Sequence, residues 1–126
     1  MFIIAIDQIP DETFDMGMEC ATIEIRCQGR VGEEYLDFTT TFTFDADVDY
    51  AGWVQEFTCS PSTMVWFSKN QSRFDSITNL PPFHVQTLKG ILKVIENLKN
   101  FSSSYRVIDD CKGPPLLKIK EEERNL

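Results

Sequence analysis

The chain has 126 residues, of which 42% are hydrophobic and 25% are charged, and its formal net charge at pH 7 is −8. This size and composition exclude intrinsic disorder as the general state, because one domain of this length buries a core without a metal or disulfide bonds. The negative charge argues against binding to nucleic acid or to an anionic membrane, and it favours a basic protein partner. Residues 1–50 carry twelve acidic and two basic side chains, whereas residues 51–126 carry eight acidic and ten basic ones.

Targeting signals and cysteine motifs are absent from the sequence. The longest apolar run, Phe2–Ile6, is far shorter than the roughly 20 residues of a membrane-spanning helix. The N-terminus lacks the basic residues and long apolar stretch of a secretory signal, so we expect a cytoplasmic protein. No CxxC pair is present, and we expect four reduced, mostly buried thiols. These are Cys20, Cys27, Cys59 and Cys111.

Two strands and a hairpin turn are predicted near the N-terminus. Phe2–Ile6 is a compact apolar run closed by Pro10, which indicates a buried strand. Thr22–Cys27 alternates between polar and apolar residues, and Gly29 and Gly32 bracket the segment that follows it. This pattern predicts a half-buried strand that enters a hairpin.

The clearest predicted strand covers Tyr35–Phe44. Leu and Phe occupy one alternation of this segment, while Asp and Thr occupy the other. Such a strand packs one face on the core and turns the other toward water. Asp45, Asp47 and Asp49 continue the polar alternation beyond Phe44.

The middle of the chain predicts a short helix and then another strand. Residues 50–58 are interpreted as a helix capped by Asp47 or Asp49, because Trp53 and Phe57 stand four positions apart. Residues 63–69 are apolar on both alternations, which is typical of a central strand covered on both faces.

A long helix is predicted from about residue 82 to residue 100. Pro81 and Pro82 begin it, because proline is tolerated in the first turn of a helix. Leu and Ile then repeat at helical spacing, and most of the intervening charged residues are Lys. Gly90 costs this helix roughly 1 kcal/mol relative to Ala, and we interpret it as a point of close backbone packing.

Together these elements predict one domain over residues 1–126, because no repeat or linker divides the chain. Tyr105–Ile108 is the last predicted strand, and the charged residues 118–126 are expected to fray. The predicted fold class is α+β. It comprises an antiparallel sheet of about five strands, with one long helix (about 82–100) packed on a face and a short helix near 50–58.

A calcium-dependent module at residues 45–56 is one alternative function. Acidic residues alternate at the start of this segment and Glu56 closes it, as the ligands of an EF-hand loop do. Position six of such a loop is normally Gly, but here it is Tyr50, and the preceding residues alternate as a strand. A solvated strand end and a helix cap explain the same residues, so we predict no metal site.

The sequence contains no recognisable catalytic motif. His84 is the single histidine, in the first turn of the predicted long helix, and neither GxSxG, GxGxxG nor a phosphate-binding loop is present. A Cys–His pair can still form between residues that are distant in sequence. A small enzyme or ligand-binding domain, with a pocket between sheet and helix, is therefore another alternative. We predict no enzymatic activity and no cofactor.

A partner-binding surface is predicted along the acidic strand and its ends. The concentration of one charge sign favours binding, because a merely solubilising surface normally mixes signs. Tyrosine beside carboxylates suits a protein interface in which the aromatic ring anchors and the charges steer. The predicted site residues are Glu33, Glu34, Tyr35, Asp37, Asp45, Asp47, Asp49 and Tyr50.

With its acidic run from Glu33 to Asp49 and no catalytic set, the chain resembles bacterial immunity proteins in general character. These proteins protect bacteria against toxins of polymorphic and contact-dependent growth inhibition systems. The resemblance implies a stoichiometric inhibitor, or antitoxin, that neutralises a basic toxin domain such as a nuclease. The implied mechanism is electrostatic mimicry, in which carboxylates occupy the surface that the toxin reserves for phosphate.

Overall fold

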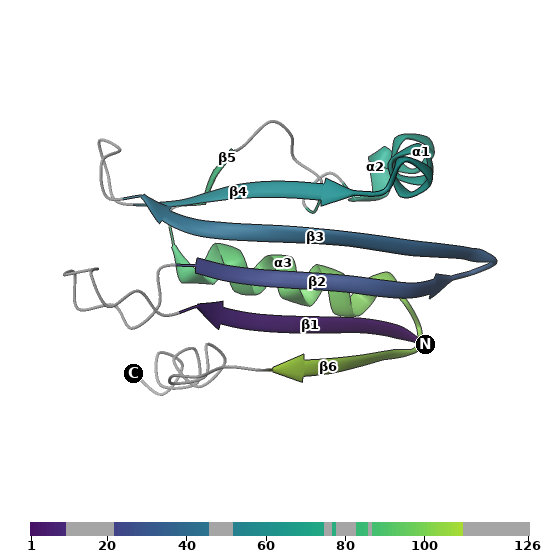
Figure 1. Ribbon diagram of the computed structural model, residues 1–126, viewed down its shortest axis with the longest axis horizontal. Helices are drawn as coiled ribbons and strands as arrows, with labels where there is room; N and C mark the ends of the chain where they lie inside the picture. The colour runs from purple at the N-terminus through teal and green to yellow at the C-terminus, as the bar shows by residue number, and fades with distance from the viewer. Residues whose placement is uncertain (10–21, 46–51, 75–76, 78–82, 86, 110–126) are drawn as a thin grey trace.

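The described residues form one six-stranded sheet with three helices, in the strand order β5-β4-β3-β2-β1-β6 (Figure 1). The strands are β1 (Phe2–Ile9), β2 (Thr22–Val31), β3 (Glu34–Asp45), β4 (Gly52–Cys59), β5 (Phe83–Val85) and β6 (Tyr105–Asp109). The helices are α1 (Pro61–Lys69), α2 (Gln71–Phe74) and α3 (Leu88–Phe101). This computed structural model describes residues 1–9, 22–45, 52–74, 77, 83–85 and 87–109. The predicted α+β class is confirmed.

The first three strands form where a compact apolar run (β1) and alternating residues (β2 and β3) predicted them, and β1 proves to be half-buried like the other two. Ile4, Cys27 and Phe38 lie opposite one another on β1, β2 and β3, and each is at most 1% exposed. Burial of every second residue along these strands fixes their register, because a shift of one position would move the apolar side chains into water.

The predicted hairpin joins β2 and β3 by a two-residue turn. Val31 pairs with Glu34, so Gly32 and Glu33 form the turn itself. Gly32 has a φ of 64°. Glycine tolerates this conformation without steric cost, and a turn that starts this way matches the twist of the two strands.

The sheet is mixed, whereas the sequence predicted a purely antiparallel one. β1 to β5 pair antiparallel in the sheet, but β6 pairs parallel with β1. The reason lies in α3, which runs back along the strand direction toward the start of β1 (Figure 1). The chain therefore enters β6 at the end of the sheet where β1 begins, and it runs in the same direction.

The short helix predicted near residues 50–58 is wrong, because Gly52–Cys59 forms β4. Trp53, Gln55 and Phe57 are buried at alternate positions and β4 pairs with β3 over its whole length. The four-residue spacing of Trp53 and Phe57 suggested a helix, but it is also two periods of a strand.

The strand predicted over residues 63–69 is also wrong, because Pro61–Lys69 forms helix α1. Ser60 caps this helix, and its hydroxyl accepts a hydrogen bond from the Thr63 amide at 3.3 Å. Pro61 occupies the first turn, where its missing N–H has no cost. Thr63 and Phe67 are buried four positions apart, so the segment has a helical core face.

The long helix is present, but α3 begins at Leu88 after the cap residue Thr87. Phe83–Val85 instead pairs with β4 as the edge strand β5, which places His84 opposite Val54. The two prolines predicted to begin the helix lie outside the described residues. Gly90 does mark close packing, because a Cβ atom at this position would meet the side chain of Val85.

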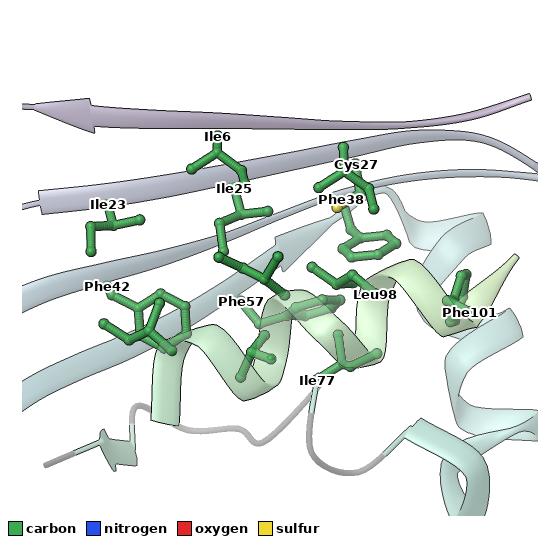
Figure 2. Packing of buried hydrophobic residues seen from close by; sticks show 14 of the residues in the cluster. Ile6, Ile23, Ile25, Cys27, Phe38, Phe42, Phe57, Ile77, Leu98 and Phe101 are labelled. Atoms are coloured by element: carbon green, nitrogen blue, oxygen red, sulfur yellow. The ribbon is translucent and has the colours of Figure 1, made fainter. Parts of the chain in front are cut away.

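The core lies between one face of the sheet and α3. In Figure 2, Ile6, Ile25 and Phe42 point from the strands toward α3. At the hairpin end, the Phe74 and Phe101 ring centroids are 4.4 Å apart, which joins α2 to α3. Phe38 and Phe67 are 5.1 Å apart and similarly join α1 to β3. We call this covered side the inner face.

Candidate protein-binding site

The opposite side, here called the outer face, is not covered by any of the described helices. Its residues alternate with those of the core along β1 to β4. Arg26, Gln28 and Asp37 are exposed there, while Ile3 and Ala5 are partly buried. An uncovered sheet face that carries both charged and aliphatic side chains is a candidate for binding another protein.

The structure separates the predicted acidic residues of β3 into two groups. Asp37 and Asp45 share the outer face, but they are eight positions apart, or about 27 Å along the strand. Thr39, Thr41 and Thr43 occupy this face between them. Asp37 and Asp45 therefore form two separate acidic positions on the outer face of β3.

The remaining predicted site residues lie at the ends of β3 or beyond it. Glu33 is in the hairpin turn, and Glu34 is exposed beside it. Tyr35 is 57% exposed and follows the alternation of the outer face. Asp47, Asp49 and Tyr50 lie outside the described residues.

A second set of carboxylates, which the sequence analysis missed, crosses the sheet. Asp7 of β1 lies opposite Glu24 of β2, Glu24 lies opposite Thr41, and Thr41 lies opposite Glu56 of β4. We call Asp7, Glu24 and Glu56 the carboxylate row. Because neighbouring strands are about 4.8 Å apart, the row extends roughly 14 Å across the outer face.

The carboxylate row is unfavourable for the sheet itself. Like charges directly opposite each other destabilise a strand pair, by roughly 0.2–1 kcal/mol. For Glu24 the repulsion is partly offset by Arg26, whose Nε lies 3.3 Å from Glu24 Oε1. Periodicity could place each of these carboxylates on the outer face, but the register of four strands was needed to align them.

The outer face is banded by charge along the strand direction. Arg30 and Arg106 are exposed toward the hairpin end, and their presence makes that part of the face mixed in sign. Arg26 lies at the middle of β2, where it pairs with Glu24 of the carboxylate row. The opposite end has the carboxylate row and Asp45. β1 and β3 end there, and β2 and β4 begin there (Figure 1).

Two connections leave the sheet at this acidic end. Ile9 and Thr22 flank one of them, and Asp45 and Gly52 flank the other. The connections lie outside the described residues, but they carry six more acidic side chains in the sequence. These are Asp11, Glu12, Asp15, Glu19, Asp47 and Asp49.

A shallow hollow of about 280 Å³ lies on the outer face, between Asp37 and the carboxylate row. We call it the outer-face depression. Its lining comes from four adjacent strands, β6, β1, β2 and β3. The residues are Ile3, Ala5, Arg26, Cys27, Gln28, Asp37, Thr39 and Ile108.

The described cysteines are poorly suited to nucleophilic catalysis. Burial raises the pKa of the Cys27 thiol, and it also raises the pKa of Cys59. Both thiols are therefore protonated near neutral pH, whereas a nucleophilic cysteine needs a lowered pKa. His84 pairs with Val54, and Cys59 is five positions further along β4, about 17 Å away.

The described ends of the proposed calcium loop are far apart. Asp45 lies opposite Gly52, whereas Glu56 lies opposite Thr41. The first and last positions are thus separated by about four residues along the sheet, or roughly 13 Å. In an EF-hand loop both positions bind the same ion at 2.3–2.6 Å, so this arrangement does not fit one. Among the described residues, no group of three His, Cys, Asp or Glu could hold a metal ion.

Comparison with known proteins gave no relatives: no family model, no curated protein and no solved structure matches the chain. Within the described part of the chain, none of the helices has the length and apolar character needed to cross a membrane.

Proposed function

We propose that the chain is a stoichiometric inhibitor that binds a basic protein through its outer face. The observation that carries this proposal is the carboxylate row, in which Asp7 and Glu24 lie directly opposite each other on an uncovered sheet face. Like charges in the carboxylate row destabilise the fold, and binding of a cationic partner that neutralises them would explain their position. The partner class we favour is a toxin domain, because the chain resembles immunity proteins in its acidity.

In the proposed mechanism, the carboxylates take the place of a phosphate backbone. A basic nuclease must hold a polyanion, and a row of carboxylates at one end of the sheet offers a similar field. Opposite fields raise association rates to about 10⁸ M⁻¹s⁻¹ or more at low salt, and this advantage falls steeply with ionic strength. Bound in this way, the inhibitor excludes the toxin's substrate.

The test begins with the protein encoded next to the chain's own gene, which the proposed function expects to contain a basic toxin domain. That domain is purified as an inactive variant. Association is followed by stopped-flow fluorescence between roughly 20 and 300 mM salt, around the range where screening changes most. The triple variant Asp7→Asn, Glu24→Gln, Glu56→Gln is expected to associate about tenfold more slowly at low salt. Its rate should also depend less on salt.

A matched control separates the carboxylate row from net charge. The single variants Glu56→Gln and Glu96→Gln each remove one negative charge, but Glu56 belongs to the carboxylate row, whereas Glu96 is exposed on α3, on the inner side of the sheet. Glu56→Gln is expected to slow association at low salt, and Glu96→Gln serves as its control. The control should leave the association rate nearly unchanged. A triple variant with the wild-type rate and salt dependence would refute the proposed function. A second triple variant, Asp45→Asn, Asp47→Asn, Asp49→Asn, tests the predicted end of the acidic strand in the same way.

A further inference from the structure

Among the described basic residues of the outer face, Arg26 alone forms an ion pair, and its partner belongs to the carboxylate row. The Arg26 Nε lies 3.3 Å from Glu24 Oε1, and the two side chains are 54% and 33% exposed. Ion pairs that are this open to solvent are weak, because water and salt screen the charges. A competing cation can therefore displace Arg26 from Glu24 at little cost.

Arg26 has a second carboxylate within reach, on the side away from Glu24. Arg26 lies opposite Thr39 on β3, and Asp37 is two positions before Thr39 on the same face. Diagonal neighbours of this kind on adjacent strands are about 7–8 Å apart, a distance that a long side chain spans. Asp37 is exposed and forms no ion pair with a described residue. Arg26 therefore lies between a paired carboxylate, Glu24, and an unpaired one, Asp37.

The outer-face depression gives the Arg26 side chain room to turn from Glu24 to Asp37. The residues opposite Arg26 on the two neighbouring strands, Ala5 and Thr39, have short side chains. The hollow above them measures about 280 Å³, and both Arg26 and Asp37 line it. Rotation about the side-chain bonds of Arg26 is therefore enough to exchange one carboxylate for the other, and the backbone of the sheet stays in place.

We propose that Arg26 is a displaceable substitute for a cationic side chain of the binding partner. In the unbound chain, it pairs with Glu24 and so offsets the repulsion between Glu24 and Asp7. When an arginine or lysine of the partner binds Glu24, Arg26 turns through the hollow and pairs with Asp37. Arg26 thereby lowers the affinity of the carboxylate row, because a bound cation must first displace it. The identity of the partner rests on the proposed function, but the exchange is tested without that partner.

The probe is the peptide acetyl-Arg-Arg-Arg-Arg-amide, titrated at low salt into the ¹⁵N-labelled full chain and followed by NMR. Nuclear Overhauser effects from the Arg26 Nε–H proton should connect to Glu24 in the unbound chain and to Asp37 at saturation. Glu24→Thr removes the carboxylate and leaves a side chain too short to reach Arg26, so this variant should show the Asp37 contact without peptide. Glu56→Thr makes the same change elsewhere in the carboxylate row and should leave Arg26 beside Glu24.

A matched pair of variants measures the competition between Arg26 and the peptide. Arg26→Gln and Arg30→Gln each remove one exposed positive charge from the outer face of β2, but Arg30 forms no ion pair with a described residue. Arg26→Gln should bind the peptide about two- to fivefold more tightly than Arg30→Gln, which corresponds to the loss of one exposed ion pair. The shifts of the Asp7 and Glu24 amides during titration give both dissociation constants.

Three results would overturn the inference. They are an absence of saturable shifts at Asp7 and Glu24, an Arg26 side chain that gains no contact with Asp37 at saturation, and equal affinities of Arg26→Gln and Arg30→Gln. Equal affinities would mean that net charge alone governs binding. The toxin association experiment decides the proposed function separately. If the carboxylate variants slow that association while the peptide leaves Arg26 in place, the inhibitor assignment stands and Arg26 is not a displaceable substitute.

Discussion

At the scale of single residues, the environment of each side chain decides its chemistry. Cys27 is 1% exposed in the core, and its burial favours the neutral thiol. Gly90 lies against Val85, where a larger residue would collide with a side chain. Neither property follows from residue type alone, because both depend on neighbours from other segments. Each leads to a measurable effect on stability.

Stability is expected to fall in alkaline solution because of Cys27. Its folded pKa is raised, so above the ordinary thiol value of 9.0 the unfolded chain loses a proton that the folded chain keeps. The contribution of the protonated Cys27 thiol to the free energy of unfolding is fully present below pH 9. It falls by about 1.4 kcal/mol for each pH unit above 9, until the pH reaches the folded pKa. Urea unfolding at pH 8, 9 and 10 measures this slope. Cys27→Ala should make the slope shallower, and an unchanged slope would show that other groups cause it.

Replacement of Gly90 by alanine is expected to destabilise the chain. Alanine favours a helix by about 1 kcal/mol over glycine, but overpacking against Val85 costs about 1–3 kcal/mol. We expect a net loss of about 1 kcal/mol in the free energy of unfolding, measured in urea. The double variant Gly90→Ala, Val85→Ala should lose less than the two single losses combined. Additive losses would mean that the two positions are not in contact.

At the scale of elements, α1 is fixed to the sheet at its first turn. The Thr63 hydroxyl accepts hydrogen bonds from the Asp37 amide at 3.1 Å and from the Ser60 hydroxyl at 2.9 Å. Thr63 is 1% exposed, so these bonds are shielded from water. The contact covers part of the β3 edge beyond the last paired residue of β4. It also holds the aromatic core residue Phe67 above Phe38.

Removal of the Thr63 hydroxyl should reveal the strength of this link. Thr63→Val keeps the shape of the side chain but leaves the Asp37 amide without its acceptor, which costs about 1–3 kcal/mol. Thr41→Val on the outer face is the matched control and should change stability by less than about 0.5 kcal/mol. Chemical unfolding followed by tryptophan fluorescence measures both. Equal effects would argue against a structural role for the hydroxyl.

The carboxylate row predicts that neutralising a charge stabilises the sheet. Asp7→Asn removes the like-charge contact with Glu24 and should raise the free energy of unfolding by about 0.2–1 kcal/mol. Thermal unfolding at low salt detects the gain. If the same variant also slows association with a basic partner, the row trades stability for binding. A loss of stability would mean that Asp7 makes favourable contacts which outweigh the repulsion.

At the scale of the whole molecule, charged side chains lie on both sides of an apolar core. The carboxylate row lies on the outer face, whereas Lys89 and Lys93 are exposed on α3 across the sheet. The net charge of −8 adds overall repulsion to the folded state. Salt screens this repulsion, and the Debye length falls to about 10 Å at 0.1 M.

Added salt is therefore expected to stabilise the folded chain. The melting temperature should rise between roughly 10 and 300 mM sodium chloride, because screening weakens repulsion among the carboxylates. The triple variant Asp7→Asn, Glu24→Gln, Glu56→Gln should show a smaller rise. Scanning calorimetry in sodium chloride and in sodium bromide separates screening from ion-specific effects. A wild-type melting temperature that does not change with salt would show that charge repulsion contributes little to stability.

Short apolar segments and sequence periodicity together predicted most of the described strands. β1, β2, β3 and β6 formed at the predicted places, and the apolar stripe of the long helix was also confirmed. The sequence predicted a helix near 50–58 and a strand over 63–69, but the structure has a strand at 52–59 and a helix at 61–69, because apolar residues on short segments fit both periods. Pairing with β3 made the first a strand, and the Ser60 cap made the second a helix.

By itself, the sequence determined the α+β class, the half-buried strands and the excess of acid in the first half of the chain. These properties depend on local alternation and on composition, which are readable one segment at a time. Only the tertiary structure decided that β6 joins β1 in parallel, that Asp37 and Asp45 lie far apart, and that Asp7, Glu24 and Glu56 align. Alignment across strands depends on register, and register results from the packing of the whole inner face against α3.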